Sequence, residues 1–183
     1  LASLNVSSAL EKGLSDRQSE PKLIKAHEVL GNVSSTIRSI SHRLTPLLIE
    51  RYGLRHALED LAETVNLSEK LRLEMIVVGF EDNGHYSLSF LNDVYRIVQE
   101  LLQNIVKHAQ ATRATVEVAE HQSHVSIMAE DNGIGVSENK NEPGKGLSSI
   151  QAKVTYLNGE IEISTPAEGG TLVAINHLSP TPE

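Results

Sequence analysis

The stretch that decides the fold is residues 89–109, which reads SFLNDVYRIVQELLQNIVKHA. Apolar residues recur in it at spacings of 3 and 4, the spacing of one face of an α-helix. They are Leu91, Val94, Ile97, Val98, Leu101 and Ile105. Polar residues occupy the opposite edge. The sequence therefore predicts a long amphipathic helix from about Ser89 to Ala109, with one buried face and one edge that is open to chemistry.

The segments on both sides of this helix predict a sheet. Ahead of it, a short amphipathic helix after Gly53 and a strand at residues 73–77 end at the turn signal Asp82-Asn83-Gly84. Behind it, we expect strands at 114–118 and 125–129, a helix at 147–157, and strands at 161–163 and 171–177. Helices on one face of strands that pair mostly with their neighbours predict an α+β fold, a two-layer α/β sandwich.

Residues 1–46 are expected to form a separate helical hairpin. Between Leu23 and Leu44 the apolar positions step alternately by 3 and 4, which makes an a/d seam that an isolated helix cannot bury. We expect the hairpin to pair with a second copy into a four-helix bundle, giving a homodimer. The alternative is that the stripe packs on this chain's own globular part. Leu1 enters a helical pattern with no capping residue ahead of it, so we expect a hairpin truncated at its N-terminus.

Composition excludes several classes of protein. Lys and Arg number 16 and Asp and Glu number 24, which gives a net charge of −8, whereas a nucleic-acid binder usually carries the opposite balance. No apolar run approaches the ~20 residues of a membrane span, so we expect no membrane contact. The chain has no cysteine, which fits a cytoplasmic location.

The polar edge of the long helix carries four groups that suit phosphate chemistry. Glu100, Asn104, Lys107 and His108 fall at i, i+4, i+7 and i+8, so regular α-helical spacing places them on one stripe. An amide oxygen can bind Mg²⁺, a lysine can pair with phosphate, and a carboxylate can accept a proton. The alternative is an ordinary solvated helix face.

Two glycine-containing segments complete the set of candidate sites. At a predicted strand end, Asp131-Asn132-Gly133-Ile134-Gly135 combines a carboxylate that can accept a bond from the adenine amine with glycines that permit a sharp turn. Directly ahead of a helix, Gly144-Lys145-Gly146-Leu147 offers backbone N–H groups that suit phosphate, and we expect a mobile lid there. Each segment taken alone is also compatible with a plain turn or helix start.

The order of these motifs resembles the ATP-binding domain of sensor histidine kinases, within the superfamily that includes gyrase-type and Hsp90-type ATPases. More narrowly, it looks like the nitrate-sensor and DesK-like subfamily of two-component kinases. The resemblance covers nearly the whole chain. It is carried by residues 99–109 (QELLQNIVKHA), Arg43-Leu44-Thr45-Pro46 and Gly53-Leu54-Arg55-His56-Ala57-Leu58, together with the Asp-x-Gly-x-Gly, Gly-x-Gly-Leu and Gly-Gly-Thr motifs.

The resemblance implies that residues 47–183 form an ATP-binding catalytic domain that uses ATP and Mg²⁺. It implies that Glu100 is the general base and that Asn104 holds Mg²⁺, with Lys107 and His108 beside the phosphates. Around the adenine, it implies a bond from the base to Asp131 and a pocket shaped by Gly133 and Gly135. It implies that Gly144, Lys145, Gly146 and Leu147 form the lid over the phosphates, and that Gly170 and Thr171 close the adenine end.

The resemblance also implies that a γ-phosphoryl group passes to a histidine and then to the receiver domain of a response regulator. In this subfamily the acceptor lies in a His-Asp pair on the first bundle helix, and no such pair occurs here. We therefore expect the acceptor to lie outside this chain, which would belong to the cytoplasmic part of a sensor. The alternatives are an anti-sigma-type serine kinase on the same fold, and a noncatalytic dimerisation scaffold.

His121 and His124 are expected to flank a hairpin tip around Gln122-Ser123. A zinc site at this tip would lack further ligands.

Overall fold

The computed structural model describes residues 46–81, 86–135 and 145–180. A helical segment over residues 46–66 is followed by the elements β1 (Arg72–Val78), α3 (Leu88–Asn104), η2 (Ile105–Ala109), β2 (Arg113–Glu120), β3 (Val125–Asp131), α4 (Lys145–Tyr156), β4 (Glu160–Ser164) and β5 (Thr171–Leu178). The expected hairpin, apart from Pro46, lies outside the described residues. So do the turn at 82–84 and the expected lid through Gly144.

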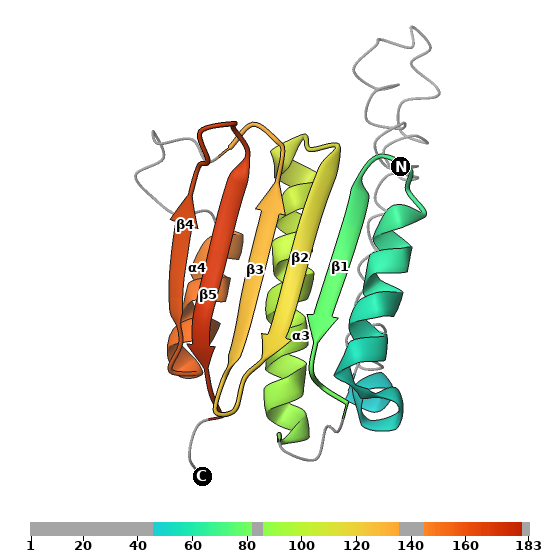
Figure 1. The fold of residues 1–183 in the computed structure, drawn as a ribbon, viewed down its shortest axis with the longest axis vertical. Helices are drawn as coiled ribbons and strands as arrows, with labels where there is room; N and C mark the ends of the chain where they lie inside the picture. Colours follow the sequence, from blue (N-terminus) through green and yellow to red (C-terminus); the bar gives the residue numbers. More distant parts are fainter. Residues whose placement is uncertain (1–45, 82–85, 136–144, 181–183) are drawn as a thin grey trace, which may run out of the picture. The chain divides into compact units, whose positions relative to one another are not determined.

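Five strands form one sheet in the order β1-β2-β3-β5-β4. The pair β1 and β2 is parallel, because α3 returns the chain to the same edge of the sheet, and the other three pairs are antiparallel. Helices α3 and α4 lie on one face of the sheet (Figure 1). This arrangement confirms the predicted α+β fold with two layers, and every strand predicted from the sequence is present.

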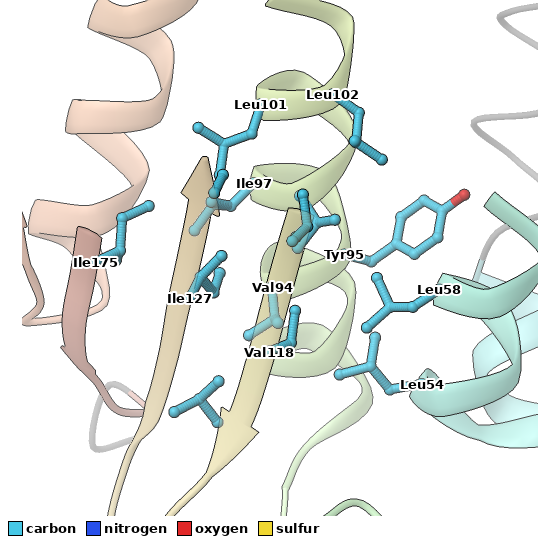
Figure 2. Packing of buried hydrophobic residues seen from close by; sticks show 14 of the residues in the cluster. Leu54, Leu58, Val94, Tyr95, Ile97, Leu101, Leu102, Val118, Ile127 and Ile175 are labelled. Carbon is cyan, nitrogen blue, oxygen red and sulfur yellow. The ribbon is translucent and has the colours of Figure 1, made fainter. Parts of the chain in front are cut away.

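The core lies between α3 and the sheet (Figure 2). The predicted helix face is buried at Val94, Ile97, Val98 and Leu101, and alternate residues of β2 and β3 face it. Each fully buried aliphatic side chain of this kind stabilises the fold by roughly 1.5–3 kcal/mol. Leu54 and Leu58 of the first helical segment extend the same core toward Tyr95 and Leu102 (Figure 2).

The first helical segment is tied to β1 by two side chains that bond to backbone. The Arg55 guanidinium donates to the carbonyl oxygens of Val77 at 2.8 Å and Gly79 at 2.6 Å. At the other end of β1, the Asn66 amide donates to the Leu73 oxygen and accepts from the Leu73 nitrogen, at 3.0 and 2.8 Å. These bonds satisfy backbone groups of an edge strand that would otherwise depend on water.

The predicted long helix is present but is not α-helical to its end. Its last five residues, Ile105–Ala109, form a π-helix, and Gln110 follows in the left-handed region with φ of 53°. A π-helix bonds residue i to i+5, so side chains beyond Asn104 rotate away from the positions of a regular α-helix. The stripe expected from α-helical spacing therefore does not continue unchanged from Asn104 to Lys107 and His108.

Three histidines from two segments meet at one end of the sheet. The rings of His121 and His124 flank the β2–β3 turn as predicted and stack with centroids 4.5 Å apart. The ring of His177 lies 4.9 Å from that of His124, at a position in β5 where φ is 60° beside a register shift. Loss of contact with water, and then the neighbouring imidazoles, lower the pKa of His124.

We expect acid to destabilise the protein through His124. An unfolded histidine has a pKa of about 6.5, so a lower folded pKa means that the unfolded chain binds the proton first as pH falls. Above about pH 6.5 His124 is neutral in both states and leaves the free energy of unfolding independent of pH. As pH falls from about 6.5 to the folded pKa of His124, the free energy of unfolding decreases. Urea denaturation between pH 7.5 and 5 should show a shallower pH dependence for His124→Asn than for the wild type. An identical dependence would contradict the assignment.

Candidate functional site

The candidate residues gather at one edge of the fold, where α3 with η2 ends, β3 ends and β5 begins (Figure 1). Asp131 is the last residue of β3 and is buried, with 6% of its surface exposed. Its register partners are Ala114 in β2 and Thr171 in β5. Because paired residues of a sheet point to the same face, the Asp131 and Thr171 side chains share the helix-covered face with buried Ala114.

The turn after β3 holds the Asp131 carboxylate in place. Its Oδ1 accepts a hydrogen bond from the Gly133 nitrogen at 2.8 Å, and the Ile134 nitrogen donates to the Ala109 oxygen at 2.9 Å. The first bond fixes the side chain relative to its own loop. The second fixes the loop against the end of η2.

Glycine is required in this loop chiefly because backbone packs against backbone. A Cβ at Gly133 would overlap the Ala109 carbonyl, and a Cβ at Gly170 would overlap the Asp131 carbonyl. At Gly135, where φ is 74°, a Cβ would come within 3.0 Å of the Gly170 oxygen. The sequence predicted that Gly133 and Gly135 permit a sharp turn. The structure adds a packing requirement, because three segments of backbone meet around Asp131.

On α3, Glu100 and Asn104 are partly buried. The Asn104 Nδ2 is buried and has no hydrogen-bond partner among the described residues. A buried donor left without a partner costs about 1–3 kcal/mol, so an incoming hydrogen-bond acceptor would be favoured there.

Lys107 and His108 are exposed in η2, and the Lys107 Nζ donates to the Gln103 Oε1 at 2.9 Å. Any contact between Lys107 and a phosphate therefore has to compete with this bond.

The predicted lid residues fall partly inside a helix. Lys145, Gly146 and Leu147 form the first turn of α4, two residues earlier than the sequence indicated, and Leu147 packs against the core. An ion pair of 2.9 Å between Lys153 in α4 and Asp93 in α3 links the two helices. Gly144 lies outside the described residues, so the lid hypothesis rests on sequence alone.

Asn132 is a residue whose role the sequence did not reveal. Its Oδ1 accepts from the nitrogens of Thr112 and Arg113 at 2.9 and 2.8 Å, and its Nδ2 donates to the Thr112 Oγ1 at 3.0 Å. Asparagine is known for bonding to backbone in turns, but its usual partners lie two residues along the chain. Partners 19 and 20 residues away cannot be found from local pattern.

An open depression of about 990 Å³ lies on the sheet face that no helix covers. Its lining includes Glu74, Thr115 and Glu130, which are paired across β1, β2 and β3. Neither Glu100 nor Asn104 lines it. Asp131 and Asn132 do line it, so the depression reaches the end of β3 that carries the candidate carboxylate.

These features define a nucleotide-binding ATPase domain. Residues 91–182 match the family described as "Histidine kinase-, DNA gyrase B-, and HSP90-like ATPase", and the chain belongs to that family. Within it, the curated relatives are sensor histidine kinases, and the chain contains the ATP-binding domain of that kind.

Two curated relatives illustrate the similarity. Sensor histidine kinase ComP of Bacillus subtilis is 31% identical over 149 residues, which is 80% of this chain and 19% of the relative. Nitrate/nitrite sensor protein NarQ of Escherichia coli is 27% identical over 164 residues, which is 84% of this chain and 28% of the relative. The chain thus spans less than a third of either relative's length.

A solved structure supports the fold. The blue-light activated histidine kinase EL346 of Erythrobacter litoralis superposes with a TM-score of 0.61 at 20% identity, covering 81% of this chain and 51% of that one. At this identity the likeness concerns the fold alone.

No group of three or more His, Asp or Glu side chains in the described ranges is placed to hold a metal ion. Within the same ranges, no helix has the length and apolar character needed to span a membrane.

Gly170→Ala should be more damaging than Gly169→Ala. Both glycines have positive φ, at 82° and 90°, so alanine at either position should lower the free energy of unfolding by about 1–2 kcal/mol. Only at Gly170 does the new Cβ also overlap the Asp131 carbonyl, whereas at Gly169 it meets no atom within 4 Å. Overpacking should add roughly 1–3 kcal/mol at Gly170 in urea denaturation. Equal losses would show that the close approach is not needed.

Proposed function

We propose that this chain is the catalytic part of a sensor histidine kinase, which binds Mg-ATP between Asp131 and Asn104. The observation that carries the proposal is the buried Asp131 carboxylate, held by the Gly133 nitrogen at the edge where α3 and η2 end. A carboxylate in that position selects a base with an exocyclic amine, and adenine has one. A hydrogen bond to a charged group contributes about 1.5–3 kcal/mol, which is enough to favour adenine over guanine.

The residues present fit a magnesium ion that arrives with the nucleotide. Mg²⁺ usually takes few protein ligands together with substrate phosphates and water. This preference is compatible with a single ligand from the protein, the amide oxygen of Asn104. The buried Asn104 Nδ2, a donor without a partner among the described residues, suits a phosphate oxygen of the same nucleotide. When bound, the ion neutralises charge on the triphosphate.

In the proposed reaction, the γ-phosphoryl group passes from ATP to an imidazole nitrogen of the acceptor histidine. Glu100 acts as general base and polarises that imidazole, while Lys107 and His108 lie near the phosphates. Gly133, Gly135, Gly170 and Thr171 shape the adenine end, and residues 144–147 cover the phosphates. Positioning and charge neutralisation supply most of the rate in such transfers.

The proposal extends to the partners of the whole protein. The phosphoryl group would be relayed to the receiver domain of a response regulator, and the hairpin of residues 1–46 would make a homodimer. Because ATP is the substrate, we place the domain in the cytoplasm. The relative ComP, which is a sensor histidine kinase by name, supports this over a serine kinase or a scaffold.

Mg-ATP should stabilise the wild-type chain, and Asn104→Asp should reduce that effect. A ligand at about 100 times its dissociation constant adds about 2.7 kcal/mol of stability. An aspartate at position 104 repels the triphosphate, so we expect affinity to fall roughly tenfold or more, as for other losses at metal sites. Thermal unfolding and isothermal titration measure both effects.

Gln122→Glu is the matched control for this experiment. It makes the same change of charge at an exposed position in the β2–β3 turn, at the opposite end of β3 from Asp131. We expect the control to bind Mg-ATP as the wild type does. Unchanged affinity in Asn104→Asp would contradict the metal role, and no stabilisation of the wild type would favour a scaffold.

Glu100→Gln should leave Mg-ATP binding nearly intact and abolish transfer. Removing a general base lowers rate by about 10²–10⁴-fold without removing a contact to the nucleotide. The measurement is incorporation of acid-labile phosphate from radiolabelled ATP in a protein that includes the acceptor helix. Glu117→Gln in β2, on the sheet face that no helix covers, should transfer at the wild-type rate. Full activity of Glu100→Gln would rule out its role as base.

A further inference from the structure

Asn132 joins two connections that lie far apart in the sequence. Its side-chain oxygen accepts from the Thr112 nitrogen at 2.9 Å and the Arg113 nitrogen at 2.8 Å, and its side-chain nitrogen donates to the Thr112 Oγ1 at 3.0 Å. Its backbone nitrogen also donates to the Arg113 oxygen at 3.2 Å. The Thr112 Oγ1 also donates to the Asn132 Oδ1 at 3.5 Å. One residue therefore binds the loop after β3 to residues 112–113 through five hydrogen bonds.

The connection that Asn132 holds is attached to the rest of the site on both sides. The Thr112 oxygen accepts from the Arg72 nitrogen at 3.0 Å, which fixes the connection to the start of β1. Ala109, the last residue of η2, accepts from the Ile134 nitrogen at 2.9 Å. A shift of residues 112–113 would therefore move the end of the helix that carries Asn104 relative to the loop that carries Asp131.

The Asn132 and Asp131 side chains differ in exposure and in partners, although both residues line the same depression. Asp131 is buried and accepts from the Gly133 nitrogen, whereas Asn132 is exposed and bonds to Thr112 and Arg113. Both polar atoms of the Asn132 amide are therefore already engaged by residues 112–113. Any influence of Asn132 on the nucleotide must pass through the backbone.

We infer that Asn132 is a positioning residue for adenine selection: it fixes the distance between Asp131 and Asn104 by clamping the β3 loop to residues 112–113. The inference rests on the proposed function and adds a specificity determinant to it. The clamp limits the freedom of the Asp131 carboxylate, and a bond to a charged acceptor loses strength steeply when its geometry is poor. Loss of the clamp should therefore reduce discrimination between bases more than it reduces binding of the triphosphate.

The test compares ATP with inosine triphosphate, in which an oxygen replaces the 6-amine. In isothermal titration with Mg²⁺, the wild type should prefer ATP by roughly tenfold or more, and Asp131→Asn should remove the preference. Asn132→Ala, which loses every side-chain bond to Thr112 and Arg113, should lower the preference by at least about fivefold, with affinity for inosine triphosphate changed by less than about twofold.

Three further variants separate positioning from general stability. Asn132→Asp keeps the acceptor oxygens for Thr112 and Arg113 and should retain the wild-type preference within about twofold. Asn132→Ser, whose shorter side chain cannot bridge both nitrogens, should lose it as alanine does, and it replaces alanine if that variant does not fold. Asn66→Ala removes a comparable pair of side-chain bonds, at Leu73 of β1, and should leave the preference unchanged.

The outcomes distinguish the two levels of the proposal. If the wild type binds neither nucleotide, the proposed function fails and the clamp fails with it. If the wild type prefers ATP and Asp131→Asn removes the preference, while Asn132→Ala and Asn132→Ser retain it, only the positioning role is overturned. An equal fall in Asn66→Ala would also overturn it, since loosening of the fold would then explain the effect.

Discussion

The buried carboxylate of Asp131 is the constraint on which the rest of the site depends. A charged group can be held at 6% exposure only where hydrogen bonds offset the loss of water. Here the nearest donor is the Gly133 nitrogen, and it can come close because the loop after β3 passes directly against Ala109 and Gly170. The glycines at 133 and 170, the bonds of Asn132 to residues 112–113 and the register of β3 all hold this carboxylate in one place on the helix-covered face.

The same edge holds local structure that is not the most stable available. The end of the long helix is a π-helix, a form that is rare in proteins and often occurs at functional sites. Just before it, the Asn104 amide nitrogen is buried without a partner in the described part of the chain. Both features are tolerated because α3 is anchored over its earlier turns by a fully buried face that includes Val94, Ile97 and Val98. The buried earlier turns of α3 therefore stabilise the helix end, where Asn104 and η2 lie at the proposed binding site.

Much of the fold could be predicted from pattern. Alternation of apolar residues at 114–118 and 125–129 and the 3–4 spacing of α3 predicted the element types correctly, because burial on one face imposes those periods. Less could be predicted at the boundaries. The π-turn at Ile105–Ala109 and the early start of α4 at Lys145 are set by contacts with other segments, and local spacing does not encode them. The contact of His177 with His124 could not be predicted either, because it depends on the pairing of β5 with β3 in the sheet.

The sequence by itself determined the two layers, the order of the elements and the residue types able to bind a nucleotide, since these follow from periodicity and side-chain chemistry. The tertiary structure alone decided which of them act together. It placed Thr171 opposite Asp131 and gave Arg55 and Asn132 their backbone partners. It also showed that the glycines are needed first for packing. The physical reason is that strand register and close backbone packing depend on contacts between segments distant in the chain, and local sequence patterns do not predict those contacts.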